Sequence, residues 1–387
     1  MTNNIQAANR PTRLALYNFC PFRTDGVAKV MLDLANGLIA RGCEVDYLCV
    51  DTQGPLADHL DRGVRVVALP SRGFFQRILH VARYLREQRP VALISAMDIA
   101  NLCILAKIIA PGPTKVVTTV HVPYSFYLKK RGGLVRFAGA LLLRWTLPKA
   151  DAIVTVSKGV ADDLARFYKA PDKTFTIYNT LDAEKARSMA DQPLQHEWFA
   201  ANQPPVILSA GRLEKEKDFS SLIRAFKRVR QEREARLVIL GEGSQRPLLE
   251  ALVAELGLDD DVQLLGYVDN PYNYMAKSSV FVLSSVAEGF ASVLLEALAV
   301  GTPIVSTNCP GGPREVLDNG KYGHLVPVGD VNALAQAIQQ TISEVKQPGL
   351  LRSRAEEFTQ DTALDQYIRV SGLGPGALPL LDHSRRA

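Results

Sequence analysis

The sequence lacks the cysteine patterns of disulfide-stapled and metal-binding proteins. Its five cysteines are odd in number and scattered, and none stands in a CxxC or Cys/His spacing. This predicts a reducing, cytoplasmic compartment. The first ten residues lack the apolar core of a signal peptide, and no stretch of about 20 residues is free of charge and strong polarity. Residues 91–110 come nearest, and we expect them to form a strand followed by a core-facing helix.

Acidic residues are scarce in the first half of the chain. Residues 1–190 carry 26 Lys+Arg against 15 Asp+Glu, and residues 191–387 carry 19 against 25, so the two halves have net charges of +11 and −6. A basic half predicts an anionic partner. Because basic runs interleaved with aromatics are absent, an anionic membrane surface is favoured over nucleic acid. Solvated charge with no partner is the alternative.

No internal repeat of solenoid length is visible, and 387 residues are more than one hydrophobic core usually supports. Short apolar runs alternate with amphipathic stretches, which is typical of βαβ units and a parallel sheet. The pattern pauses in the polar stretch 182–205 and then restarts. The sequence therefore predicts an α/β protein with two Rossmann-like doubly wound domains, 1–190 and 191–354. A last helix over about 355–372 and a flexible Gly/Pro-rich tail, 373–387, follow. Ligands bind outside the carboxyl ends of such strands, so we expect the site in a cleft between the domains.

The most informative segment is SSVAEGFASVLLEALAVGTPIVST, residues 284–307. Glu288 and Glu296 stand eight positions apart in it, and Gly301 and Pro303 mark the end of a helix. If these were ordinary residues, Glu288 would be a surface turn residue and Glu296 an exposed helix carboxylate.

The predicted helix begins near Ala291 or Ser292, which places Glu288 in the turn before it and Glu296 about one turn inside. At a rise of ~1.5 Å per residue, the two carboxylates are too far apart to act on one bond. The arrangement suits a long ligand whose central anion meets the backbone N–H groups of Phe290, Ala291 and Ser292 at the helix N-terminus.

With these two glutamates the chain resembles glycosyltransferase family 4, whose members have the GT-B fold and whose signature is this spacing. The resemblance covers nearly the whole chain. It implies a retaining hexosyltransferase that uses a nucleotide diphosphate sugar, with the final helix returning to the first domain. It assigns Glu288 to the hydroxyls of the donor sugar and Glu296 to the ribose hydroxyls. Gly289 completes the predicted donor-binding turn.

A second segment, SAGRLEKEKDFSSLIRAF, places Arg212 and Lys217 between a strand end and a helix. Two cations there can hold a diphosphate, Arg by its fork and Lys as a compact charge. In the resembled family, the Arg and Lys at these places bind the diphosphate and stabilise it as it leaves. Lys215 competes with Lys217 by position, but the Lys-Asp pair before the helix matches the family at Lys217. Ordinary surface cations are the alternative.

Two further candidates lie in the first half. The family has two adjacent glycines in the first βα turn where this chain has Asp25 and Gly26, so Gly26 alone keeps the close backbone approach to phosphate. His121, in TTVHVPYSFY, follows a strand, and the family carries a histidine there near the donor sugar and the reacting centre. A loop glycine and a structural histidine are the alternatives.

The remaining family-like pieces extend the predicted donor site. The turn of Gly266, Tyr267 and Val268 is where the nucleotide base would rest. Asn179 would line the cleft, and the Gly311–Gly312 pair would close near the donor.

Asp259, Asp260 and Asp261 contain an Asp-x-Asp of the kind that other glycosyltransferases use to hold a metal. They precede a predicted strand, and this is the wrong end of the sheet for a site. We therefore predict no metal site and no cofactor beyond the nucleotide sugar. Arg212, Lys217 and a helix N-terminus would then neutralise the leaving diphosphate.

Residues 124–145, YSFYLKKRGGLVRFAGALLLRW, combine five basic residues with Phe, Leu and Trp. They predict either an interfacial amphipathic helix on anionic lipid or a core helix with basic ends. The first reading implies peripheral binding to the cytoplasmic face of a membrane and a lipid-linked acceptor.

Uridine diphosphate sugars are the commonest donors in the family, so a UDP-hexose or UDP-N-acetylhexosamine is expected. The segment NCPGGPREVL resembles members that build surface polysaccharides or lipid-linked oligosaccharides. A sugar-nucleotide epimerase of GT-B fold and a non-catalytic nucleotide-sugar-binding partner are the rival hypotheses. A dehydrogenase is disfavoured because no GxGxxG follows the first strand.

Overall fold

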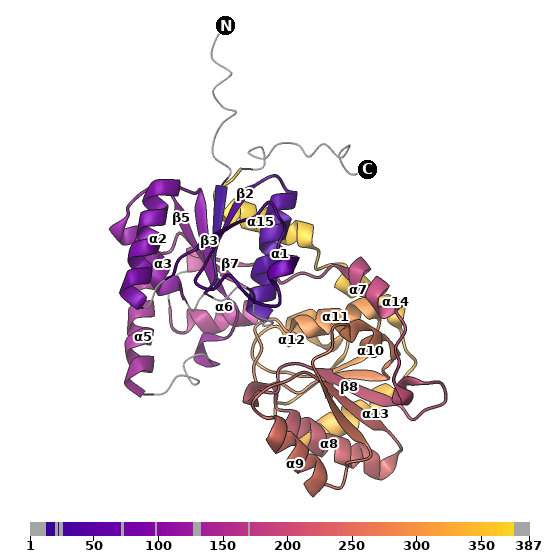
Figure 1. The fold of residues 1–387 in the computed structure, drawn as a ribbon. Helices are drawn as coiled ribbons and strands as arrows, with labels where there is room; N and C mark the ends of the chain where they lie inside the picture. Colours follow the sequence, from indigo (N-terminus) through magenta and orange to yellow (C-terminus); the bar gives the residue numbers. More distant parts are fainter. Residues whose placement is uncertain are drawn as a thin grey trace, which may run out of the picture. The chain divides into compact units, whose positions relative to one another are not determined.

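The structure is a computed structural model that describes residues 13–19, 22, 26–70, 73–96, 99–126, 133–168 and 171–374. The chain divides into two compact units (Figure 1). The first contains Met1–Val156, Val160–Tyr178 and Gln360–Ala387, and the second contains Ser157–Gly159 and Asn179–Thr359. The chain thus enters the second unit at Asn179 rather than at the predicted boundary of 190/191. All but the first two residues of the predicted tail lie outside the described residues.

The described part of the first unit forms a seven-stranded parallel sheet in the order β3-β2-β1-β4-β5-β6-β7. The strands are β1 Arg13–Tyr17, β2 Glu44–Cys49, β3 Arg65–Ala68, β4 Ala92–Ala96, β5 Lys115–Val120, β6 Ala152–Thr155 and β7 Thr174–Thr176. The helices are α1 Gly26–Ala40, α2 Phe74–Gln88, α3 Ala100–Ile109, α5 Gly133–Thr146, α6 Lys158–Ala165 and α15 Gln360–Val370. The predicted strand and helix within 91–110 are confirmed as β4 and α3.

Helices cover both faces of this sheet. In Figure 1, α2 and α3 lie on one side of the strands, and α1 and α15 lie on the other. The right-handed crossover rule places α2, α3 and α5 on one face, because each leads from one strand to another that lies further along the sheet in the same direction: β3 to β4, β4 to β5 and β5 to β6. The last helix, α15, packs on α1, where a Cβ at Gly37 would come within 2.8 Å of Leu364.

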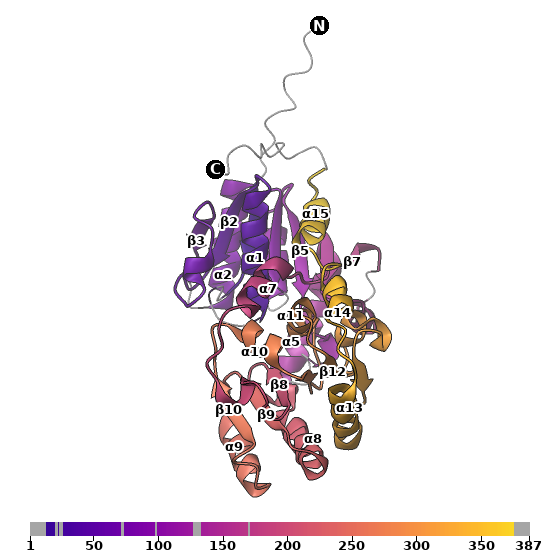
Figure 2. The same cartoon turned by 90° about the vertical axis from the view of Figure 1, so that its right-hand side faces the viewer.

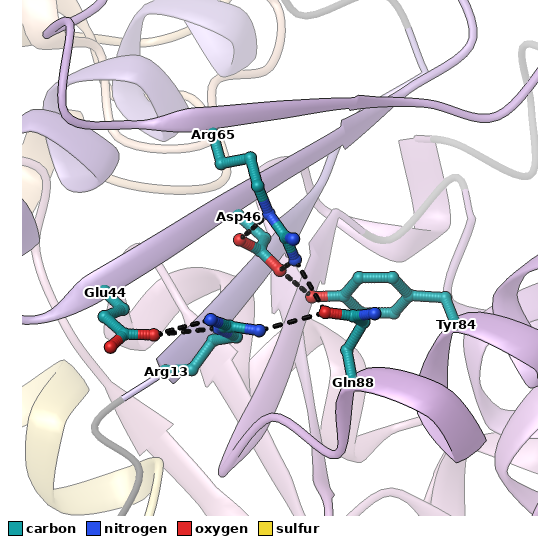
Figure 3. A network of polar contacts seen from close by, with 6 residues as sticks. All are labelled: Arg13, Glu44, Asp46, Arg65, Tyr84 and Gln88. Carbon is teal, nitrogen blue, oxygen red and sulfur yellow. Dashed lines mark hydrogen bonds and ion pairs between the residues drawn. The ribbon is translucent and has the colours of Figure 1, made fainter.

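A polar network holds α2 against the edge of the sheet (Figure 3). The buried carboxylate of Asp46 accepts hydrogen bonds from the guanidinium of Arg65 and, at 2.5 Å, from the hydroxyl of Tyr84. The side-chain oxygen of Gln88 accepts from Arg13 at 2.9 Å and from Arg65 at 3.0 Å. Burial, with the Asp46 contact, raises the pKa of Tyr84 far above its usual value, so this hydroxyl stays a donor. Three strands and one helix are therefore fixed to one another.

The second unit has a six-stranded parallel sheet in the order β10-β9-β8-β11-β12-β13. The strands are β8 Val206–Ala210, β9 Arg236–Leu240, β10 Val262–Gly266, β11 Val280–Leu283, β12 Ile304–Thr307 and β13 His324–Val326. The helices are α7 Ala183–Ala190, α8 Phe219–Glu232, α9 Arg246–Glu255, α10 Pro271–Lys277, α11 Ser292–Val300, α12 Pro313–Val316, α13 Val331–Ser343 and α14 Pro348–Ala355. Figure 2 shows α8, α9 and α13 on one side of the strands, with α10 and α11 on the other. The prediction of two doubly wound parallel sheets is confirmed.

The strand order of the second unit fixes where its site must lie. Strands β8 and β11 are neighbours in the sheet but are separated along the chain by two βα units. From β8 to β10 the chain adds strands toward one edge of the sheet, and from β11 to β13 it adds them toward the other edge. Ligands bind at such a switch point, outside the carboxyl ends of the strands. The loops that follow β8 and β11 therefore meet there.

No helix among the residues that the structure describes is both long and apolar enough to cross a membrane.

Candidate functional site

The loops after β8 and β11 bring Lys217 to Glu288. The Nζ atom of Lys217 lies 2.6 Å from Oε1 of Glu288, and these side chains are 18% and 11% exposed. The hydroxyl of Ser285 donates to the same Oε1 at 2.6 Å, and the hydroxyl of Ser284 donates to the carbonyl of Lys217 at 2.7 Å. A half-buried ion pair with a hydroxyl donor thus stands at the switch point. Charge-assisted hydrogen bonds of this length are strong, so this ion pair fixes the Glu288 carboxylate relative to Lys217.

The turn that carries Glu288 is held by a pair of glycines. The N–H of Glu288 donates to the carbonyl of Pro310 at 3.1 Å. A Cβ added at Gly311 would come within 1.6 Å of the Glu288 carbonyl, and one at Gly312 within 2.4 Å of the Phe290 carbonyl. Only glycine permits so close an approach. The two glycines of the NCPGGPREVL segment therefore pack directly under the predicted donor-binding turn.

Helix α11 begins where the sequence predicts, with Ser292 as its first residue. Ala291 precedes it in the left-handed conformation, at φ 63° and ψ 59°, and no side chain caps the helix. A non-glycine residue in this region costs about 1–3 kcal/mol and is concentrated at functional sites. The first N–H groups of an uncapped helix need outside acceptors, which an anion can supply. Asn179 lies at this helix start, since its side-chain nitrogen is 3.2 Å from the Ser292 hydroxyl.

The other predicted cation, Arg212, is more exposed than Lys217 and lies farther from its carboxylate partner. The side chain of Arg212 is 57% exposed, and its closest carboxylate oxygen, on Glu216, is 3.4 Å away. Lys215 is exposed on the same short helical turn as Lys217. Of the two lysines that competed in the sequence, Lys217 is the one that reaches Glu288.

Of the residues predicted to hold the nucleotide, the Gly266–Val268 turn begins at the end of a strand and Glu296 lies inside a helix, as the sequence predicted. Gly266 ends β10 at φ 82°, and a Cβ there would come within 2.9 Å of Glu242. Tyr267 follows it with 65% of its surface exposed, and Val268 is half-buried. Glu296 lies within α11, half-buried. The roles of these residues toward the nucleotide stay predictions.

Sequence reasoning missed Ser285 and Cys309. Ser285 stands three positions before Glu288, and this spacing was the available signal, because a turn can fold a side chain back onto one three residues later. Cys309 is buried, and burial, followed by the nearby charge of Glu288, raises the pKa of its thiol to about 12. Its thiol is therefore neutral and is not a nucleophile.

The Asp259–Asp261 segment precedes β10, as expected. The carboxylate of Asp261 is paired with Arg230, at 2.7 Å, and with Arg236. Among the described residues, no group of three or more His, Cys, Asp or Glu side chains could hold a metal ion. Asp261 thus ties α8 and β9 to the start of β10.

Two family models match the chain. Residues 191–358 match the model described as glycosyl transferases group 1, and residues 24–185 match that of glycosyltransferase family 4. An N-acetylgalactosaminyltransferase of Campylobacter jejuni is 34% identical over 266 residues, which are 68% of this chain and 70% of that enzyme. The chain belongs to the group 1 glycosyltransferases. The family inferred from the glutamate segment is confirmed.

Solved structures share the fold of this group 1 glycosyltransferase. A glycosyltransferase from Rickettsia africae aligns with a TM-score of 0.76 at 18% identity, over 93% of this chain and 97% of its own. Anabaena HepE, solved with UDP and glucose, aligns with a TM-score of 0.77 at 18% identity, over 92% and 98%. At these identities the likeness establishes the fold alone, and the predicted GT-B architecture is confirmed.

Two predicted site residues of this glycosyltransferase lie in the first unit. Gly26 is the first residue of α1, exposed, and a Cβ there would meet nothing within 4 Å. His121 follows β5, and its Nε2 atom is 2.8 Å from the Thr119 hydroxyl. Desolvation by burial lowers the pKa of His121 from 6.5 to about 4. At neutral pH the ring is therefore uncharged, so one of its nitrogens donates a hydrogen bond and the other accepts one.

The low pKa of His121 predicts a pH effect on stability. Between pH 4 and 6.5 the unfolded chain binds a proton here that the folded protein does not bind, so the free energy of unfolding falls as the pH is lowered through this window. Comparing urea unfolding at pH 7 and pH 5 should show a smaller loss for His121→Asn than for the unchanged protein. The exposed His59 supplies the control variant His59→Asn. An unchanged loss in His121→Asn would contradict the assignment.

Proposed function

We propose that the protein is a retaining glycosyltransferase that moves a hexose or N-acetylhexosamine from a UDP-sugar to a glycan or lipid-linked acceptor of the cell surface. One sequence relative supports the proposed acceptor, and one solved structure of the same fold supports the proposed donor. The Campylobacter jejuni enzyme is named for transfer of N-acetylgalactosamine onto a diphospho-undecaprenol-linked sugar. HepE has been solved with UDP and glucose.

The observation that carries the proposal is the contact between Lys217 and Glu288 beside the uncapped start of α11. A cation and a row of backbone N–H groups form a site for a diphosphate. The carboxylate next to them accepts hydrogen bonds, as sugar hydroxyls require. Without donor, each charge neutralises the other. With donor bound, Lys217 faces the phosphates and Glu288 the sugar, while the Ser285 hydroxyl keeps the carboxylate in place.

The chemistry we propose is electrostatic. The bond between the anomeric carbon and the phosphate oxygen breaks, and its electron pair leaves with the diphosphate, whose growing charge Lys217, Arg212 and the α11 N-terminus stabilise. The acceptor hydroxyl attacks from the side that the diphosphate leaves, and a phosphate oxygen receives its proton. The anomeric configuration is thereby retained, and no residue forms a covalent intermediate. We propose that no metal takes part, because side chains and the helix supply the positive charge.

Glu296 and the Gly266–Val268 turn hold the nucleoside in this proposal. Glu296 accepts from the ribose hydroxyls, and the exposed Tyr267 ring offers a surface for the uracil. Gly26 admits the phosphates close to the start of α1, and neutral His121 bonds the donor sugar.

A thermal-shift panel of nucleotide sugars tests the proposal. A preferred UDP-sugar at 100 times its Kd should stabilise the fold by about 2.7 kcal/mol through mass action, and EDTA should change neither this stabilisation nor turnover. The preferred donor is then incubated with and without acceptor, and the products are followed by NMR. Transfer with an unchanged anomeric configuration supports the proposal.

Three results would contradict it. An isomerised donor formed without acceptor indicates an epimerase of the same fold. Donor binding with no turnover on any polyprenyl- or oligosaccharide acceptor indicates a binding partner of another transferase. An inverted product excludes the retaining mechanism.

A further inference from the structure

Three buried hydroxyl groups join the ends of β11 and β12 to the two charges of the candidate site. The Thr307 hydroxyl, at the end of β12, donates to the carbonyl oxygen of Ser285 at 2.6 Å. The Ser285 hydroxyl donates to Oε1 of Glu288 at 2.6 Å, and the Ser284 hydroxyl donates to the carbonyl oxygen of Lys217 at 2.7 Å. The loop after β11 is therefore bonded to β12 on one side and to the Lys217 turn on the other.

These hydroxyl groups lie beneath the surface of the site. Ser285 is 0% exposed, and Ser284 and Thr307 are each 2% exposed, whereas the side chains of Lys217 and Glu288 keep 18% and 11%. Buried polar groups that lose a partner destabilise a protein, so each hydroxyl fixes the group to which it donates. Because the three residues cannot touch a ligand, they can act on a substrate only through Lys217 and Glu288.

The two oxygens of the Glu288 carboxylate have different surroundings. Oε1 accepts hydrogen bonds from the ammonium of Lys217 and from the hydroxyl of Ser285. A carboxylate oxygen has two lone pairs, so these two donors fill Oε1. Within the part of the chain that the structure describes, no group donates to Oε2. Oε2 is therefore the oxygen that remains for a ligand.

We propose that Ser285 and Thr307 are positioning residues that fix the plane of the Glu288 carboxylate and so reserve Oε2 for a hydroxyl of the donor sugar. Thr307 fixes the backbone of Ser285, and the Ser285 hydroxyl fixes Oε1. This inference rests on the proposed function, because it takes the donor sugar as the partner of Oε2.

The Ser285 hydroxyl has its largest effect when donor is bound. In the proposed mechanism Lys217 then faces the diphosphate, which leaves Ser285 as the donor to Oε1. Without this hydroxyl, the long Glu288 side chain would regain rotamers that it must lose again to meet the sugar. With it, that entropy is lost on folding, before donor arrives. A carboxylate placed in advance needs no reorganisation during the reaction.

Steady-state kinetics of the full chain test the proposal. Thr307→Val removes the hydroxyl at nearly constant size and should lower kcat about fivefold, whereas Thr307→Ser keeps the hydroxyl and should change kcat by less than about twofold. Ser285→Ala acts directly on Glu288 and should lower kcat about tenfold. In all three variants the Kd of UDP alone, measured by calorimetry, should stay unchanged, since UDP carries no sugar. A merely structural role would weaken UDP binding as well.

The matched control is Thr341→Val, within α13. Thr341 is 4% exposed and its hydroxyl donates to the carbonyl oxygen of Ala337 at 2.7 Å, so it resembles Thr307 in burial and bonding. This variant should leave kcat unchanged. An equal loss of kcat in Thr341→Val and Thr307→Val overturns the inference, and so does full activity in Ser285→Ala.

A double-mutant cycle tests the contact without donor. In urea unfolding, the variant with both Ser285→Ala and Glu288→Ala should lose less stability than the sum of the two single losses, because their hydrogen bond is lost only once. The control cycle pairs Glu288→Ala with Ser278→Ala. Ser278 is 1% exposed, precedes β11, and donates to the carbonyl oxygen of Met275 at 2.8 Å, so its loss should add to that of Glu288→Ala.

The two experiments separate this inference from the proposed function. Additive losses in both cycles overturn the inference even where the unchanged protein transfers sugar normally. Coupling between Ser285 and Glu288 in a protein that binds and turns over no nucleotide sugar refutes the proposed function and still supports the positioning of the carboxylate.

Discussion

Replacing Lys217 with Ala is expected to lower kcat by about 10²–10³-fold, the usual effect of removing one group that stabilises charge in the transition state. In the proposed mechanism, the variant loses the cation that faces the leaving diphosphate. The fold should survive, because α8 and β11 are held by a hydrophobic core in which Lys217 has no part. Glu288 keeps the hydrogen bond from Ser285. Steady-state kinetics with the preferred UDP-sugar measure the effect, and circular dichroism checks the fold.

The control for this experiment is Lys215→Ala. Lys215 lies on the same short helical turn, Lys215–Lys217, but is exposed and does not reach Glu288. Its replacement should change kcat by less than a factor of two. Full activity in Lys217→Ala, or an equal loss of kcat in Lys215→Ala, would contradict the assignment of Lys217 to the diphosphate.

The second large effect is expected from Gly311→Ala. The new methyl group would stand 1.6 Å from the Glu288 carbonyl, and the residue would also be forced to keep a φ of 114°. Both the collision and the strained backbone oppose folding, so we expect a loss of about 2–5 kcal/mol in the free energy of unfolding. Relief of the collision requires the Glu288 turn to move, so kcat should fall at least tenfold in the folded fraction. Urea unfolding and kinetics below the midpoint separate the two effects.

Gly320→Ala separates the collision from the backbone strain. Gly320 has a similar φ of 101°, but a Cβ there would meet nothing within 4 Å. It should lose only the ~1–2 kcal/mol that a side chain in this conformation costs, with turnover unchanged. Equal losses of stability and activity in the two variants would show that the contact under Glu288 has no special role.

The ion pair between Lys217 and Glu288 leaves neither charge of the proposed donor site without a partner. Two opposite charges that are 18% and 11% exposed satisfy one another, so neither is left desolvated and unpaired before the nucleotide sugar arrives. In the proposed mechanism, donor binding exchanges this ion pair for a contact between Lys217 and phosphate and for hydrogen bonds between the Glu288 carboxylate and the sugar. The exchange favours specificity, because a ligand with only one of the two groups would leave the other charge without a partner.

The sequence by itself determined the alternation of strands and helices, the start of α11 at Ser292 and the family. These follow from short-range rules, since the hydrophobic repeat, the helix start and the Glu288–Glu296 spacing depend on residues within one or two turns of each other. The place of the Asp259–Asp261 segment before a strand was also predicted from local sequence. The pairing of Asp261 with Arg230 and Arg236 could not be predicted from the sequence.

Only the tertiary structure decided which side chains meet. Lys217 and Glu288 are 71 residues apart, and they touch because β8 lies beside β11 in the sheet, an order that hydrophobic periodicity does not encode. The same holds for the contact between Gly311 and the Glu288 turn. Tyr124 shows this limit: local sequence left open an interfacial helix or a core helix with basic ends, and the packing of Phe167 and Tyr168 against Tyr124 buries it. The basic run 129–131 of the same segment lies outside the described residues. Contact depends on the packing of distant segments, and local sequence carries no direct record of that packing.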